Sequence, residues 1–176
     1  SRQQCASTIA PMNWTWHGFD GFDIHALYDA LALRCRVFIG EQGPYQDPDG
    51  IDQRSWHLLG RDAGGALVAY LRVVEPGIKY AEPSIGRVIT APEVRGSGAG
   101  KLLMREGIAC ARSVWPGCAI RISAQARLRR FYEELGFSAV GDEYLEDDIP
   151  HLEMLLAAEA GPAAHAALAM SSANPT

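Results

Sequence analysis

The sequence lacks several features that would assign its class directly. It has only four cysteines in 176 residues, and none are in the CxxC spacing of zinc or dithiol redox sites. No apolar run approaches the roughly 20 residues that cross a bilayer, and the N-terminus has no apolar segment of the kind found in secretory signals. Positive charge is not in excess either, with a net charge of -5 and a pI of about 5.5. We therefore expect a cytoplasmic protein with neither nucleic-acid nor membrane partners.

What is present is an ordinary globular composition. Hydrophobic residues make up 48% of the chain and charged residues 21%, and this length suits a single compact domain. We expect that domain over residues 13–156, with a disordered tail at 1–12 and an Ala-rich tail at 157–176. Because Cys35 and Cys110 fall on the apolar faces of predicted helices, we expect the thiols to be buried.

Hydrophobic periodicity in the first half of the chain predicts a strand, a helix and a hairpin. A strand is expected over 13–17, followed by a helix that Asp20 or Asp23 caps and that ends near Gly40. Its predicted apolar face consists of Leu27, Leu31, Cys35 and Phe38. The turn-rich segment 43–50 is a candidate for substrate contact. Apolar runs at 56–59 and 66–74, joined through Gly64 and Gly65, indicate an antiparallel hairpin.

The second half predicts two strand-helix units and two closing strands. The strands are expected over 84–90, 118–123, 137–140 and 151–155. The first helix shows Leu103, Gly107, Cys110, Ala111 and Val114 on one face, and the second shows Leu128, Phe131, Tyr132 and Leu135, with Gly136 ending it. This order predicts an α+β fold with one mixed, mostly antiparallel central sheet and helices on both of its faces.

The glycine-rich segment between the predicted strand 84–90 and the helix after it points to a phosphorylated cofactor. In residues 88–101 a strand ends at Pro92, and a loop dense in glycine opens the helix. Such a loop aims backbone N–H groups and the positive end of the helix dipole at one point, which suits a phosphate or pyrophosphate. Arg95 and Leu102 occupy positions where an ATP-binding P-loop needs Gly and Ser or Thr, and Lys101 and Leu103 stand where a dinucleotide fingerprint needs Gly.

Two motifs in this half resemble one family. Arg95, Gly98 and Gly100 form an Arg-x-x-Gly-x-Gly pattern that resembles the acetyl-CoA pyrophosphate loop of the GNAT (GCN5-related N-acetyltransferase) superfamily. The segment 125–137 is similar to the GNAT pattern Asn-x-x-Ala-x-x-(apolar)-Tyr-x-x-x-Gly-Phe, although Gln125 replaces the Asn and Leu128 the Ala. Both motifs occur in the order and at about the distance that the family requires.

Further segments resemble the ElaA-like branch of that superfamily. The similarity extends over 33–45, 84–88, 124–126 and 149–154, together with Asp49, Asp52 and His57. Gly43 stands where that branch often has Cys. The resemblance therefore covers nearly the whole predicted domain.

The resemblance implies the GNAT fold and acetyl transfer from acetyl-CoA directly to a primary amine of a small molecule or peptide, without a metal. Because GNAT proteins often dimerise, it also allows a homodimer. By resemblance, the backbone N–H groups of Val88, Ile89 and Thr90 bind the pantetheine arm and polarise the thioester. The remaining cofactor contacts that it implies are Arg95, Gly96, Ser97, Gly98, Ala99, Gly100, Lys101, Gln125 and Tyr132.

The catalytic assignments each have a structural alternative. Tyr132 is the candidate general acid, because a phenol of pKa about 10 in contact with a thiolate can protonate it; its apolar spacing also suits a core residue. Glu41, His57 and His151 are candidate bases, although each of them could instead be a capping, core or sheet residue. For the acceptor, Arg34 and Arg87 either hold a carboxylate or pair with Asp49 or Asp52, and Tyr45 and His151 complete the predicted acceptor site.

Two other functions remain open at the level of sequence. An acyl-homoserine-lactone synthase has a similar Leu-Arg-x-x-Val-Phe helix, but its pyrophosphate loop is not built like the one at 95–100. A non-catalytic acyl-CoA-binding module would keep the loop and dispense with Tyr132 as an acid.

Overall fold

The computed structural model describes residues 10–43 and 46–160. Tyr45, Cys5 and most of both predicted tails lie outside the described residues. Within them, the first strand begins at Asn13 and the last ends at Leu156. No helix in the described part of the chain is long and apolar enough to cross a membrane.

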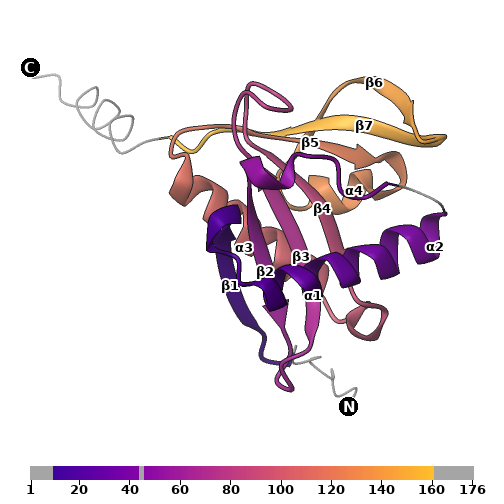
Figure 1. The fold of residues 1–176 in the computed structure, drawn as a ribbon. Helices are drawn as coiled ribbons and strands as arrows, with labels where there is room; N and C mark the ends of the chain where they lie inside the picture. Colours follow the sequence, from indigo (N-terminus) through magenta and orange to yellow (C-terminus); the bar gives the residue numbers. More distant parts are fainter. Residues whose placement is uncertain (1–9, 44–45, 161–176) are drawn as a thin grey trace, which may run out of the picture.

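One seven-stranded sheet organises the described residues (Figure 1). Its order is β1-β2-β3-β4-β5-β7-β6, and every neighbouring pair is antiparallel except β4 with β5. The predicted α+β fold with a mixed, mostly antiparallel sheet is thus confirmed. The strands are β1 (Asn13–Gly18), β2 (Ser55–Arg61), β3 (Leu67–Val74), β4 (Ser84–Thr90), β5 (Ile120–Gln125), β6 (Ser138–Glu146) and β7 (Ile149–Leu156).

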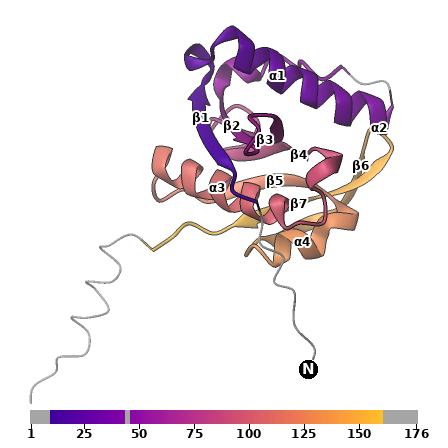
Figure 2. The same ribbon diagram turned by 90° about the horizontal axis from the view of Figure 1, so that it is seen from below.

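Helices cover both faces of this sheet, as expected. Seen from below, α1 lies on one side, and α3 and α4 lie on the other (Figure 2). The main helices are α1 (Ile24–Arg34), α2 (Gly40–Gln42), α3 (Ala99–Val114) and α4 (Arg129–Glu133). Asp23 caps α1, because its side chain accepts the N–H groups of His25 and Ala26 at 2.9 and 2.8 Å.

The buried face of α1 differs by one position from the predicted one. Ala26, Ala30 and Leu33 are buried against the sheet, whereas Cys35 is exposed. Two helical stripes one residue apart have the same period, and the small Ala side chains let the helix approach the sheet more closely than leucines would. A π-helical turn over Cys35–Ile39 follows and continues the buried face with Val37. The prediction of a buried thiol is therefore wrong for Cys35, and Cys110 and Cys118 are only half-buried.

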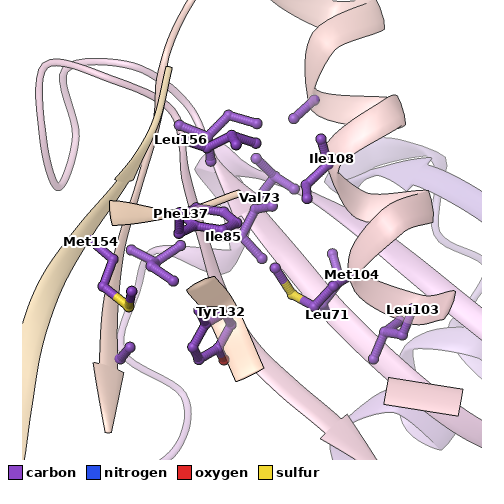
Figure 3. Packing of buried hydrophobic residues seen from close by; sticks show 14 of the residues in the cluster. Leu71, Val73, Ile85, Leu103, Met104, Ile108, Tyr132, Phe137, Met154 and Leu156 are labelled. Atoms are coloured by element: carbon purple, nitrogen blue, oxygen red, sulfur yellow. The ribbon is translucent and has the colours of Figure 1, made fainter. Parts of the chain in front are cut away.

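The larger core lies between α3 and the opposite face of the sheet (Figure 3). Leu103, Met104 and Ile108 of α3 belong to the same buried cluster as Leu71 of β3 and Met154 of β7. Gly107 lets α3 approach the sheet, since a Cβ atom there would lie 2.6 Å from a methyl carbon of Leu71. This packing fixes the N-terminus of α3 beside the end of β4.

Candidate active site

A cleft of about 600 Å³ lies between β4 and β5. The two strands are paired only at their beginnings, where Ser84 lies opposite Arg121. Beyond this pair they diverge, and the space between them is lined by residues 85–90 of β4 and by Ile122, Ser123 and Gln125 of β5. Diverging strands leave backbone groups unpaired at the centre of a sheet, so the cleft is a place where a ligand can bind to main chain.

A β-bulge turns the middle of β4. Tyr70 and Arg72 of β3 lie opposite Ile89 and Gly86, so two steps along β3 oppose three along β4. Arg87, at this point, has a φ of 51°, an uncommon value for a residue with a side chain. Strain of this kind is concentrated at functional sites.

The end of β4 presents backbone donors to the cleft. The N–H of Ala91 donates to the carbonyl of Val68 at 2.8 Å, toward β3. Because N–H and C=O groups alternate sides along a strand, those of Thr90 point the other way, toward the gap between β4 and β5. The carbonyl of Thr90 indeed accepts from Arg95 Nε at 3.2 Å. The Thr90 N–H is thus directed to the cleft.

We call the glycine loop after β4, residues 96–100, the cradle. Gly96 and Gly98 have φ values of 77° and 91°, which only glycine adopts without strain. Gly98 is the N-cap of α3 and has no side chain to occupy the N–H groups of the first turn. These donors and the helix dipole therefore remain available to an anion beside the cleft, which is the fit that a pyrophosphate requires.

The two cations of the loop differ in position. Arg95 lines the cleft and forms a two-pronged pair with Glu41, with both N–O distances 3.0 Å. Lys101 instead pairs with Glu134, which follows α4, at 2.5 Å. Both pairs are largely exposed to solvent.

Tyr132 lies between the core and the cleft. Its ring packs edge-on against Phe131 and Phe137. Tyr132 and Phe137 both belong to the buried cluster (Figure 3). It also lines the cleft, and burial raises the pKa of its phenol to about 12. The core and catalytic interpretations of Tyr132 are therefore compatible, and the phenol keeps its proton at neutral pH.

A polar surface on β5, β6 and β7 forms the opposite wall of the cleft. Along β5, Ile120, Ile122 and Ala124 face the core under α3, so Ser123 and Gln125 face the other way. The neighbouring strands add Tyr144 and His151, which lie opposite each other in the register and whose rings are stacked. We call Ser123, Gln125, Tyr144, Glu146 and His151 the polar wall.

Within the polar wall, hydrogen bonds fix two groups. The Ser123 hydroxyl donates to Glu146 Oε2 at 2.9 Å and lies 2.5 Å from the Tyr144 hydroxyl. His151 Nδ1 is 2.7 Å from the carbonyl oxygen of Ile149, which can only accept. In the neutral ring, Nδ1 therefore carries the proton and Nε2 the lone pair.

Comparison with known proteins agrees with this geometry. A family model described as an acetyltransferase (GNAT) domain matches residues 37–158. The chain belongs to the GNAT superfamily. The protein ElaA of Escherichia coli is 40% identical over 134 residues, covering 74% of this chain and 87% of ElaA. This chain is therefore a member of the ElaA-like branch.

Two further relatives extend over most of this GNAT domain. A UPF0039 protein of Synechocystis sp. is 44% identical over 145 residues, covering 82% of this chain and 94% of that protein. A crystal structure of an acyl-CoA N-acyltransferase from Pseudomonas aeruginosa is 39% identical, with a TM-score of 0.79, covering 84% of this chain and 100% of that one. These matches confirm the predicted GNAT fold.

The GNAT cleft brings together most of the predicted site residues. On the β4 side, the cleft is lined by Arg87, Val88, Ile89, Thr90 and Arg95. The other predicted residues that line it are Glu41, Gln125, Tyr132 and His151. Gly96, Ser97, Gly98, Ala99 and Gly100 form the adjoining cradle and the first turn of α3. Lys101 points toward the end of α4, and Tyr45 lies outside the described residues.

His57 does not lie in the GNAT cleft. It is 1% exposed, its Nε2 is 2.9 Å from the carbonyl of Asp52, and its Nδ1 is 2.7 Å from the Tyr70 hydroxyl. Desolvation lowers its pKa to about 4. With both nitrogens bonded and no access to a substrate, His57 is a buried structural residue, which corrects the expectation that it acts as a base.

Arg34 is likewise a structural residue. It is 1% exposed and pairs with Asp47 at 2.7 Å and with Asp52 at 2.9 Å. The alternative that it pairs with carboxylates of this segment is therefore the one the fold adopts, and it cannot reach an acceptor. Arg87 joins the same network through Asp47 at 2.9 Å but also lines the cleft.

Sequence reasoning missed several residues of the GNAT cleft. Lys79, Ser123 and Glu146 line it, and Tyr144 supports them. The strand β6 was expected to end at residue 140 but extends to Glu146, so Tyr144 and Glu146 were not placed on a strand. Alternation of apolar and polar residues along β5 was the one signal that could have indicated Ser123.

Proposed function

We propose that this chain is an acetyl-CoA-dependent N-acetyltransferase that acts on a primary amine in the cleft between β4 and β5. The observation that carries the proposal is that one cleft is lined by the end of β4, by Arg95 of the glycine loop, by Tyr132 and by the polar wall, and that the uncapped start of α3 follows shortly after Arg95 in the chain. The Pseudomonas relative, named as an acyl-CoA N-acyltransferase, supports the same class of donor.

The cofactor would be held mainly by backbone. The first-turn N–H groups of α3 and the loop glycines suit the pyrophosphate, and Arg95 stands at the same end of the cleft. The pantetheine arm would extend along β4, where Thr90 presents its N–H to the gap. Donors fixed in a strand polarise a thioester carbonyl without a reorganisation cost.

The transfer itself needs one base and one acid. The amine nitrogen bonds to the thioester carbon, the C–S bond breaks, and the amine loses a proton. We assign that proton to Nε2 of His151, whose other nitrogen is held by the carbonyl of Ile149. Tyr132 gives its phenolic proton to the departing thiolate and regains a proton through solvent from the histidine, so the products are an amide and a thiol.

Thermal unfolding tests the donor. Acetyl-CoA, S-adenosylmethionine, NAD and ATP are compared at the same concentration. A ligand at 100 times its Kd stabilises the fold by about 2.7 kcal/mol, which raises the midpoint by roughly 5–10 °C. We expect a shift with acetyl-CoA only. No shift with acetyl-CoA would refute the proposal, and a shift with S-adenosylmethionine would favour the lactone synthase.

Thiol release from acetyl-CoA in the presence of an amine panel tests the chemistry. Replacing Tyr132 by Phe keeps the ring packing and removes the acid, so we expect kcat to fall about 100-fold with an unchanged midpoint of unfolding. Tyr132→Phe with full turnover would remove the tyrosine from the mechanism. Binding of acetyl-CoA without turnover of any amine would leave the non-catalytic module as the better description.

A further inference from the structure

The acceptor end of the cleft contains a cation whose charge the protein does not balance by a close pair. Lys79 lies in the connection between β3 and β4 and lines the cleft. Among the described residues, no carboxylate lies within 4.0 Å of its ammonium nitrogen, which instead lies over the face of the Tyr80 ring, 5.4 Å from the centroid. Lys79 is an exposed residue, so its ammonium is accessible to an anion bound in the cleft, and such an anion would oppose the lowering of its pKa by the surrounding protein.

The neighbouring arginines contrast with Lys79. Arg34, Arg72 and Arg87 form a network with three carboxylates. The carboxylates of this network are Asp47, Asp49 and Asp52, each shared between two of the arginines. Arg121 pairs with Glu82 at 3.0 Å and Glu153 at 2.8 Å. These guanidinium groups are balanced within the fold. Arg127, which also lines the cleft, donates through Nε to Gln125 Oε1 at 2.8 Å, whereas Lys79 is the cleft cation whose charge interacts with Glu146 of the polar wall.

The polar wall offers the complementary charge. Glu146 lines the same cleft as Lys79, and Ser123 holds one of its oxygens at 2.9 Å. The lysine and the glutamate are further than 4.0 Å apart and so do not neutralise each other directly, yet their charges interact. A positive and a negative group thus face one space, with the free nitrogen of His151 on the same wall.

We infer that the acceptor is a small amino acid, with its carboxylate bound by Lys79 and its amine placed between Glu146 and His151. This inference rests on the proposed function and names the substrate class for the same cleft. A zwitterion matches Lys79 with its carboxylate and the acidic side of the cleft, Glu146 and Asp147, with its ammonium. A diamine would satisfy Glu146 but would bring a second ammonium toward Lys79, and a neutral amine would leave the charge of Lys79 unbalanced.

Turnover of matched acceptors tests this inference. The free L-amino acids are compared with their C-terminal carboxamides, which keep the amine and side chain and lose the negative charge. Putrescine, cadaverine and spermidine represent diamines and polyamines. We expect kcat/KM for the best amino acid to exceed that of its carboxamide by about ten- to a hundred-fold, the usual range for a hydrogen bond to a charged group.

Variants of the lysine locate the effect. Lys79→Met should lower kcat/KM for that amino acid at least about ten-fold, mainly through KM, and change it less than about two-fold for the carboxamide, while Lys79→Arg should retain most of the preference. Arg54→Met is the matched control, since Arg54 is exposed and pairs with Glu75 near the base of the same connection. Carboxamides or diamines as the better acceptors, or a Lys79→Met loss equal for both, would overturn the inference.

Failure of this inference is distinguishable from failure of the proposed function. If the protein binds acetyl-CoA and acetylates only diamines, the proposed N-acetyltransferase function is supported and only the proposed amino-acid acceptor is rejected. Should no acceptor turn over, thermal unfolding with coenzyme A plus each amino acid or carboxamide decides between the two outcomes. A further shift for free acids that Lys79→Met abolishes supports the inference, and equal shifts for acids and carboxamides refute it.

Discussion

The two ends of the cleft are built in different ways. The proposed cofactor end comes from one continuous stretch, residues 88–101, in which strand, loop and first helical turn would supply the binding groups through the backbone. The acceptor end is assembled from four separate elements that bring Lys79, Arg87, Ser123 and His151 together as side chains. The first depends on local conformation, whereas the second depends on a buried charge network and on strand pairing. Mutations should therefore act differently at the two ends.

The largest expected effect is on stability at the acceptor end. Asp47 is fully buried and bonds both Arg34 and Arg87. Asp47→Ala removes one of the two carboxylate partners of both Arg34 and Arg87 and leaves the buried network with an excess positive charge, so we expect a loss of about 3–5 kcal/mol in the free energy of unfolding, measured in urea. The exposed pair of Arg36 and Glu93 on the cofactor side is the control, and Glu93→Gln should have a much smaller effect, as is usual for exposed pairs. Equal losses would erase the contrast between the two ends.

The next effect is a pH dependence of stability that comes from His57, which is buried beside the charge network of the acceptor end. His57 is neutral in the fold, with a pKa lowered from 6.5 to about 4, and the unfolded chain binds its proton more readily. The stability contributed by His57 is therefore complete above about pH 6.5 and decreases as pH falls toward 4, by about 1.4 kcal/mol per unit within that window. His57→Gln should flatten this part of the unfolding profile. An unchanged slope would mean that the imidazole is already charged in the fold.

A smaller effect is expected at the cradle. Gly98→Ala forces a side chain into a φ of 91°, which should cost about 1–2 kcal/mol of stability and weaken acetyl-CoA binding about ten-fold. Gly117, at φ 78° in the turn before β5, is a matched control away from the cleft. Gly117→Ala should lose similar stability with the Kd for acetyl-CoA unchanged, as calorimetric titration would measure. Loss of affinity in both variants would assign the effect to general destabilisation.

The smallest effect concerns the pair across the cofactor end. The carboxylate of Glu41 accepts hydrogen bonds from both terminal nitrogens of Arg95. Glu41→Gln should therefore make the guanidinium available to the cofactor and tighten acetyl-CoA binding up to about five-fold, because an exposed pair contributes under about 1 kcal/mol. Glu75→Gln, at the exposed pair with Arg54, should leave the Kd unchanged. A fall in kcat of about 100-fold with Glu41→Gln would instead restore Glu41 as the general base.

The sequence predictions were accurate where structure depends on neighbouring residues, and less accurate where it depends on packing between distant elements. The strand over 84–90, the glycine loop and the left-handed Gly136, at φ 95°, lie where the local pattern placed them. For α1, periodicity predicted the helix but selected the stripe of Leu27 and Leu31 in place of Ala26 and Ala30. A helical repeat of apolar residues shows that the helix has an apolar face. Which of two adjacent rows of residues is buried depends on how closely the helix packs on the sheet.

By itself, the sequence determined the family, the order of elements and the position of the glycine loop, because each of these depends on residues close together in the chain. Tertiary structure alone decided which charged side chains reach the cleft. Arg34 and His57 are held in the interior by partners 13 residues away along the chain, while Lys79 and Glu146 are brought to one space from separate parts of the sheet. The energy of a charge is set by its surroundings, and strand pairing brings those surroundings together from distant parts of the chain.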